Sequence, residues 1–268
     1  MKNRIRGEFI LKFLIVGDVC GRPGREAFRK YVLELKKEHN IDVVVVNGEN
    51  IAGGRGISRK TLDEIYRAGA DIVTSGNHIW DQKEIVSFID DEPFLIRPAN
   101  YPEGAPGKGY CIYPFKAKNI GVINVSGRTF MPPMDCPFQK VDEILKEIKN
   151  QCDIILVDIH AEATSEKIAM GFYLDGKVTC VVGTHTHVQT ADNRILPKGT
   201  AYISDLGMVG PYNSSLGINV NNAIDKFITC RPVRFEMAEG PNIFSAVVLE
   251  LAEDNSVKSF ERILFNEE

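Results

Sequence analysis

The chain has 268 residues, of which 44% are hydrophobic and 25% are charged, and its formal net charge is −4. This composition predicts an ordinary globular core, and the lack of a basic excess argues against duplex nucleic acid as a partner. No apolar stretch approaches the roughly 20 residues that a membrane-spanning helix needs, so no membrane partner is expected. The six cysteines form no CxxC pair and are interpreted as free thiols of a reducing compartment, which predicts a cytoplasmic protein.

The first third of the chain alternates between apolar strands and amphipathic helices. Residues 1–9 are predicted to be an extension, followed by a single domain over 10–268. Strands are expected at 11–16, 42–46 and 71–74, and the helices that follow them at 23–37, 58–68 and 83–89. Ser58 is the type of residue that caps a helix N-terminus. This alternation predicts a mainly parallel sheet covered by helices.

The segment 93–114 has a different character, because it contains five prolines and three glycines. It is predicted to be an ordered loop and a possible small cap or insertion. Beyond it, the expected strands are 120–125, 153–160, 178–184 and 201–205, and the expected helices are 141–149 and 162–172. A loop is predicted over 207–222, and antiparallel strands over 233–237, 244–251 and 256–264.

Polar side chains of the types that bind metals lie at or just after the ends of five predicted strands. They are Asp18, Glu49, Asn50, Asn77, His78, His160, His185 and His187. In open α/β sheets, ligands bind outside the carboxyl ends of the strands, so these side chains are expected to meet at one edge. Carboxylate, amide and imidazole groups bind divalent metals. The pattern predicts a site for two metal ions, an arrangement that suits phosphoester hydrolysis.

Several of these motifs resemble the ordered motifs of the calcineurin-like metallophosphoesterases. They are Gly17-Asp18, Gly76-Asn77-His78, the strand-end His160 and Gly183-Thr184-His185-Thr186-His187. Longer phrases, such as Val46-Asn47-Gly48-Glu49-Asn50, resemble the bacterial YmdB-like branch of that superfamily, and the resemblance covers nearly the whole chain beyond residue 10. It implies an α/β fold in which two mixed sheets are flanked by helices, an αββα sandwich with its active site at the carboxyl ends of the strands.

The chain departs from the wider superfamily at two motifs. Asp18-Val19-Cys20 stands where Asp-x-His is usual, and Gly48-Glu49-Asn50 stands where the superfamily has Gly-Asp. The YmdB-like branch is similar in both respects, so the resemblance implies that Glu49 bridges the two metals. It assigns one metal to Asp18, Glu49, Asn50 and His187, and the other to Glu49, Asn77, His160 and His185. His78 remains off the metals, as a proton donor or a phosphate contact.

Some assignments stay open at this level. Cys20 could replace a metal ligand, Arg128 or Arg194 could contact phosphate, and the loop 53–56 is either a plain loop or a wall of the site. His185 and His187 share a face on an extended strand, so they reach different metals only if the chain turns, which Gly183 is expected to permit.

The function that the resemblance implies is hydrolysis of a small phosphodiester, such as the cyclic nucleotide 2′,3′-cAMP, by attack of a metal-bridging hydroxide. The two metals are expected to be iron or manganese, with zinc as a further option. A phospho-ligand-binding regulator with little turnover and a phosphomonoesterase or 5′-nucleotidase are the alternatives. A homo-oligomer is implied by the family resemblance alone.

Overall fold

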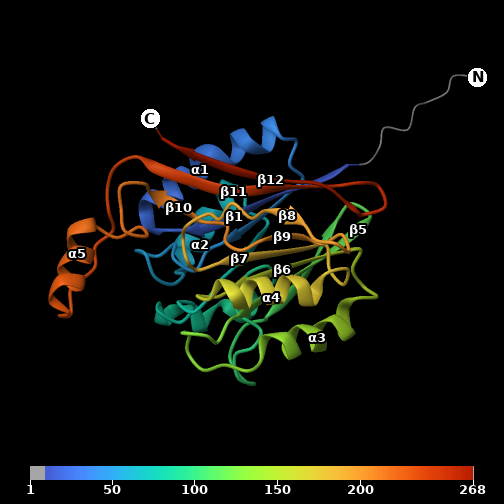
Figure 1. Cartoon of the computed structure of the whole chain (residues 1–268), viewed down its shortest axis with the longest axis horizontal. Helices are drawn as coiled ribbons and strands as arrows, with labels where there is room; N and C mark the ends of the chain where they lie inside the picture. The colour runs from blue at the N-terminus through green and yellow to red at the C-terminus, as the bar shows by residue number, and fades with distance from the viewer. Residues whose placement is uncertain (1–9, 268) are drawn as a thin grey trace, which may run out of the picture.

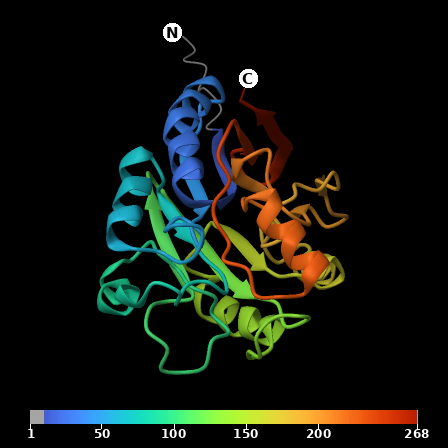
Figure 2. The same ribbon diagram turned by 90° about the vertical axis from the view of Figure 1, so that its left-hand side faces the viewer.

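The computed structural model describes residues 10–267, so the extension predicted at 1–9 lies outside the described residues. Two six-stranded mixed sheets pack face to face, and helices cover their outer faces (Figure 1). Figure 2 shows the same layers from the end of the molecule at which helix α5 lies. This arrangement confirms the predicted α/β sandwich of two sheets flanked by helices.

The first sheet has the order β12-β11-β10-β1-β2-β3. Its strands are β1 (Leu11–Val19), β2 (Val43–Asn47), β3 (Ile72–Thr74), β10 (Met208–Pro211), β11 (Asn242–Leu251) and β12 (Val257–Asn266). Strands β1, β2, β3 and β10 run parallel, while β11 and β12 are antiparallel. The β2 run of four valines is buried on both faces, as expected of a parallel strand covered on both sides.

The second sheet has the order β4-β5-β6-β7-β9-β8. Its strands are β4 (Tyr110–Phe115), β5 (Lys118–Ser126), β6 (Ile154–His160), β7 (Cys180–Thr184), β8 (Arg194–Ile195) and β9 (Ala201–Ile203). Four central strands are parallel, and the edge strands β4 and β8 are antiparallel to their neighbours. The carboxyl ends of β5, β6 and β7 therefore lie at the same edge.

Four helices cover the sandwich: α1 (Gly21–Glu38) and α2 (Arg59–Ala68) pack on the first sheet, and α3 (Pro137–Ile148) and α4 (Thr164–Leu174) on the second. The predicted cap is confirmed, because the Ser58 hydroxyl accepts a hydrogen bond from the Thr61 amide. Two 3₁₀ turns, Lys83–Ser87 and Ile89–Asp91, replace the predicted short helix. Within residues 10–267, no helix is long and apolar enough to cross a membrane.

The loop predicted over 93–114 is confirmed over 93–109, but its last residues begin strand β4, whose antiparallel pairing with β5 makes it an edge of the second sheet. Two further predictions for irregular parts of the chain were wrong. The loop predicted over 207–222 contains β10, and α5 (Val220–Thr229) begins within it. The strand predicted over 233–237 does not form, because only Met237 makes a bridge, to Ile218. Helix α5 projects from one end of the molecule (Figure 1).

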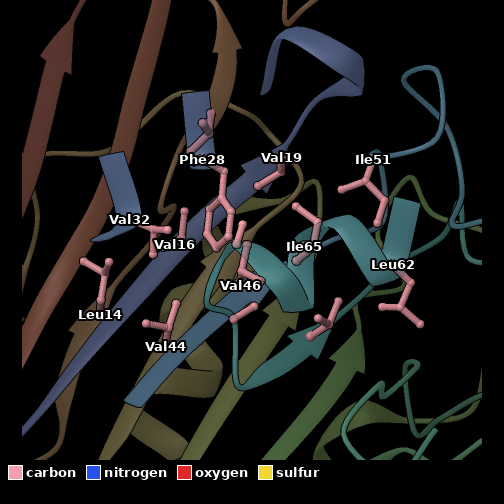
Figure 3. Close-up of a cluster of buried hydrophobic side chains, with 14 of the residues drawn as sticks. Leu14, Val16, Val19, Phe28, Val32, Val44, Val46, Ile51, Leu62 and Ile65 are labelled. Atoms are coloured by element: carbon pink, nitrogen blue, oxygen red, sulfur yellow. The ribbon is translucent and has the colours of Figure 1, made fainter. Parts of the chain in front are cut away.

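Phe28 of α1 anchors the layer between the first sheet and its helices. Its side chain is fully buried among Val16, Val32 and Val46 (Figure 3). We expect Phe28→Ala to lower the free energy of unfolding by about 3–5 kcal/mol, because it removes apolar contacts and leaves a cavity. Chemical denaturation measures the loss. Leu33→Ala on the same helix is the control, since Leu33 is 57% exposed, and an equal loss in both variants would contradict the packing argument.

Candidate metal centre

The seven predicted metal ligands come from both sheets and meet at the carboxyl ends of the strands. The oxygen ligands Asp18, Glu49, Asn50 and Asn77 lie at the ends of β1, β2 and β3. The imidazole ligands His160, His185 and His187 lie at the ends of β6 and β7. The facing sheets thus bring together residues that are far apart in the sequence, as the strand-end pattern predicted.

One group of ligand atoms surrounds Asp18. Asp18, Glu49 and His187 each offer a ligand atom, and these atoms lie within 4.8 Å of one another. Nδ2 of Asn50 lies 3.1 Å from Oε1 of Glu49 and 3.2 Å from Nε2 of His187. A metal ion would take the amide oxygen of Asn50, which faces the group once the amide turns over.

A second group surrounds His160. Glu49, His160 and His185 also place ligand atoms within 4.8 Å of one another. Nε2 of His160 lies 3.2 Å from Oε1 of Glu49, 3.0 Å from Oδ1 of Asn77 and 3.1 Å from Nδ1 of His185. Glu49 belongs to both groups, so its carboxylate stands where a bridging ligand is needed.

Each of the three imidazoles has one nitrogen in the cluster and the other on a partner outside it. Nδ1 of His160 lies 3.0 Å from the Thr184 hydroxyl. Nε2 of His185 lies 3.1 Å from Oε2 of Glu162, and Nδ1 of His187 lies 3.1 Å from the Leu216 carbonyl oxygen. Histidines that bind metals almost always donate their second N–H to such a partner, which fixes the tautomer and the orientation of the ring.

The chain turns between His185 and His187, as expected, but Gly183 does not supply the turn. Gly183 remains within β7, and its lack of a side chain serves close packing, since an added Cβ would lie 1.8 Å from the Ser204 carbonyl oxygen. The chain turns at the histidines themselves, with φ of 97° at His185 and 61° at His187. Non-glycine residues in this region cost on the order of 1–3 kcal/mol each and persist where the surroundings hold them.

Burial and close contact shift the pKa values of three of the candidate ligands, in different directions. Burial raises the pKa of Asp18 to about 7 and outweighs the opposing effects of His187 and His160. Burial and the neighbouring His160 lower the pKa of His185 to about 3. Burial also disfavours the charged form of Glu49, but its contact with His160 prevails and lowers the pKa of that carboxyl.

The residues present fit a pair of metal ions. Within residues 10–267, Oδ1 of Asp18 is a buried oxygen atom with no hydrogen-bond partner. A buried carboxylate oxygen without a donor is costly unless a cation meets it. Two imidazole nitrogens that face each other at 3.1 Å, those of His160 and His185, also suit a shared cation. Oxygen and nitrogen ligands without thiolate admit manganese, iron or zinc.

His78 stands beside the cluster. Its backbone amide donates to Oε2 of Glu49 at 3.1 Å, which ties the residue to the site. Its ring Nδ1 lies 2.9 Å from Oδ2 of Asp81, and the side chain is 24% exposed. The loop 53–56 lies against this segment, because a Cβ at Gly56 would lie 3.2 Å from the His78 carbonyl oxygen.

The sequence also left open the roles of Cys20, Arg128 and Arg194. Sγ of Cys20 lies 3.6 Å from Nδ1 of His187, the nitrogen that faces away from the cluster. Arg128 is exposed, and its guanidinium lies 3.7 Å from the Cys136 sulfur. Arg194 lies in β8 and places its guanidinium over the ring of Tyr202.

Neither Glu162 nor Asp81 is among the site residues that the sequence predicted. Asp81 follows His78 by three residues in an irregular segment, so no periodic pattern points to it. Glu162 lies two residues after His160, close enough in sequence to be considered, but only the fold shows that it contacts His185.

The order of the strands and the ligands at their ends place the chain in the metallophosphoesterase fold class. Residues 14–263 match the family model described as YmdB-like protein. A 2′,3′-cyclic-nucleotide 2′-phosphodiesterase of Bacillus subtilis is 51% identical over 260 residues, which cover 96% of this chain and 98% of the relative. The chain belongs to the family of YmdB-like proteins.

Two solved structures are similar over nearly the whole chain. A hypothetical protein from Thermus thermophilus is 40% identical, with a TM-score of 0.91 over 96% of this chain and all of that one. A protein of Mycoplasma pneumoniae described as a novel phosphatase is 35% identical, with a TM-score of 0.92 over 97% of this chain and 95% of that one. Both similarities extend beyond the strand-end motifs to the whole sandwich.

Proposed function

We propose that this protein is a dinuclear metal-dependent phosphodiesterase that hydrolyses 2′,3′-cyclic nucleotides such as 2′,3′-cAMP. The observation that carries the proposal is that Glu49 is shared by two groups of ligand atoms, each compact enough for one ion. The name of the Bacillus subtilis relative, at 51% identity, supports the substrate class. We take manganese or iron as the metals.

The proposed ligands follow the two groups. Asp18, Asn50 and His187 would hold one ion, Asn77, His160 and His185 the other, and Glu49 would bridge them. When bound, two ions at such a site lower the pKa of water and neutralise phosphate oxygens. The buried carboxylates and the fixed imidazoles hold this site rigid, which pre-organises it for the substrate phosphate.

His78 is proposed to protonate the leaving oxygen. Water adds to phosphorus and loses a proton to solvent, the bond between phosphorus and the 2′ oxygen breaks, and the 2′ oxygen takes a proton from the ring. This leaves a 3′-monophosphate, and the ring regains its proton from solvent. Because Nδ1 is engaged by Asp81, Nε2 is the nitrogen that faces the substrate. The Asp81 carboxylate accepts a hydrogen bond from Nδ1 and so sets the orientation of the ring.

Asp81 should therefore matter for turnover and not for metal binding. We expect Asp81→Asn to lower kcat roughly 10- to 100-fold, because the ring of His78 loses its orientation. Steady-state kinetics on 2′,3′-cAMP with elemental analysis of the same samples would measure both effects. Asp91→Asn, at an acid of the nearby 3₁₀ turn, is the control, and equal kinetics in the two variants would contradict the positioning role.

The proposed function is tested by assaying metal-loaded protein on 2′,3′-cAMP and on a nucleoside monophosphate side by side. Faster opening of the cyclic diester supports the proposal. A phosphomonoesterase is the second candidate, favoured by the description of the Mycoplasma pneumoniae relative as a phosphatase. Faster release of phosphate from the monoester would establish that reading, and tight binding without turnover would identify a regulator.

A further inference from the structure

A buried ion pair lies beneath the turn that carries His185 and His187. Lys167 of α4 and Asp205, which follows β9, have fully buried side chains, and Nζ of Lys167 lies 2.6 Å from Oδ2 of Asp205. Burial of two charges is unfavourable unless each is paired and hydrogen-bonded. The neighbouring inward positions of α4 are apolar, Met170 and Leu174, so packing alone gives no reason for a lysine at 167. The contacts of the pair supply the reason.

Both members of the pair contact Thr186. Oδ2 of Asp205 accepts hydrogen bonds from the Thr186 amide at 3.1 Å and from the Thr186 hydroxyl at 2.6 Å. Nζ of Lys167 donates to the Thr186 hydroxyl at 3.2 Å, and Oδ1 of Asp205 accepts from the Gly207 amide at 2.7 Å. An asparagine has one acceptor oxygen and could not receive all these donors. A carboxylate at position 205 can accept from Thr186, Gly207 and the Lys167 ammonium group at once.

Thr186 is the residue between the two histidines whose backbones adopt positive φ. Fixing its amide and its hydroxyl at once holds the middle of the turn. His185 then faces the group around His160, while His187 faces the group around Asp18. The Lys167 side chain also packs closely against Gly183, because a Cβ at Gly183 would lie 2.8 Å from Cδ of Lys167.

We infer that the Lys167–Asp205 pair is a positioning device that acts through Thr186 to aim His185 at one metal and His187 at the other. The inference rests on the proposed two-metal function. Within residues 10–267, no hydrogen bond joins either charged side chain to a candidate ligand, although the charges of Asp205 and Lys167 are felt at Asp18 and His185. Their effect through Thr186 is therefore expected on the affinity and geometry of the metals. Outer contacts of this kind typically change metal affinity roughly 10- to 100-fold.

The test compares four variants of the full chain after removal of metal by a chelator. Thr186→Val removes one hydroxyl at nearly constant shape, Thr186→Ser retains it, and Lys167→Met removes the buried cation. Thr179→Val is the matched control, since Thr179 precedes β7 at its other end and its hydroxyl accepts from the Ile155 amide at 3.2 Å. Mn²⁺ titration followed by electron paramagnetic resonance gives the dissociation constants and the signal of the coupled metal pair. Thermal unfolding of the metal-free chains measures stability separately.

We expect Thr186→Val and Lys167→Met to raise the Mn²⁺ dissociation constants roughly 10- to 100-fold and to weaken the coupled signal. Thr186→Ser and Thr179→Val should behave as the unaltered chain. Unchanged Mn²⁺ binding in Thr186→Val, or an equal loss in Thr179→Val, would overturn the positioning role and leave the two-metal function standing. An unaltered chain that binds no Mn²⁺, Fe²⁺ or Zn²⁺ would overturn both.

Discussion

Replacing Glu49 by alanine is expected to remove most of the metal that the purified protein binds, and its phosphodiesterase activity with it. Glu49 is the one ligand common to both groups of ligand atoms, and its side chain is 1% exposed. Loss of the carboxylate that is proposed to bridge the ions would take a ligand from each and leave more charge repulsion between them. Elemental analysis of the purified variant, followed by a Mn²⁺ titration, measures the effect.

Glu166→Ala is the matched control for this experiment. The Glu166 carboxylate accepts hydrogen bonds from the amides of Arg128 and Thr129 and contributes to neither ligand group. The control should retain its metals. Two metals per chain in Glu49→Ala would refute the bridging role, whatever the activity of that variant.

Replacing His78 by alanine is expected to lower kcat by roughly 10²- to 10⁴-fold while metal content stays the same. The ring contacts Asp81 and lies outside both ligand groups, so its removal takes away a proton donor and no ligand. The backbone amide that binds Glu49 is retained in the variant. Single-turnover kinetics on 2′,3′-cAMP, with metal analysis of the same samples, separates the two effects.

His39→Ala provides the comparison, since His39 caps the far end of α1. A His78→Ala variant that loses its metals would place His78 among the ligands. A variant with unchanged kcat would remove it from the reaction, and the proton for the leaving oxygen would then have to come from solvent.

The regular part of the fold was predictable because its strands are apolar runs and its helices have a buried stripe. The valines of β2 and the Ser58 cap of α2 are strong local signals, and both are confirmed. The three apolar clusters between the layers follow from them, since the central strands bury side chains both toward the facing sheet and toward a helix. The division into two sheets came from the resemblance of the motifs.

The region around α5 was mispredicted because local patterns there have no tertiary partner. The segment 233–237 does alternate between half-buried and exposed side chains, but among residues 10–267 no strand lies beside it to pair. Helix α5 buries only Ala223, while Phe227 and Ile228 are about four-fifths exposed. The apolar residues of α5 do recur at helical spacing, so the periodic signal was present in the sequence and the predicted loop over 207–222 overlooked its start.

The positions of the candidate ligands could be predicted because strand ends of parallel sheets converge. The contacts that hold these ligands in place could not be predicted from the sequence. Lys167 and Asp205 are 38 residues apart and share no motif, so their pairing beneath Thr186 depends on how α4 packs on β7. The turn at His185 and His187 could not be predicted either, because positive φ at these histidines is held by tertiary contacts and not by local preference.

The proposed ligands are divided between the sheets, with oxygen ligands on the first and imidazoles on the second. Ions bound there would cross-link two halves that otherwise meet through apolar packing and a few buried hydrogen bonds, such as those from Thr74 and Asn47 to Asp158. A ligand specific for the folded state adds about 2.7 kcal/mol of stability at 100 times its dissociation constant. Because proteases cut chains that have opened, metal starvation would shorten the lifetime of this protein in the cell as well as its activity.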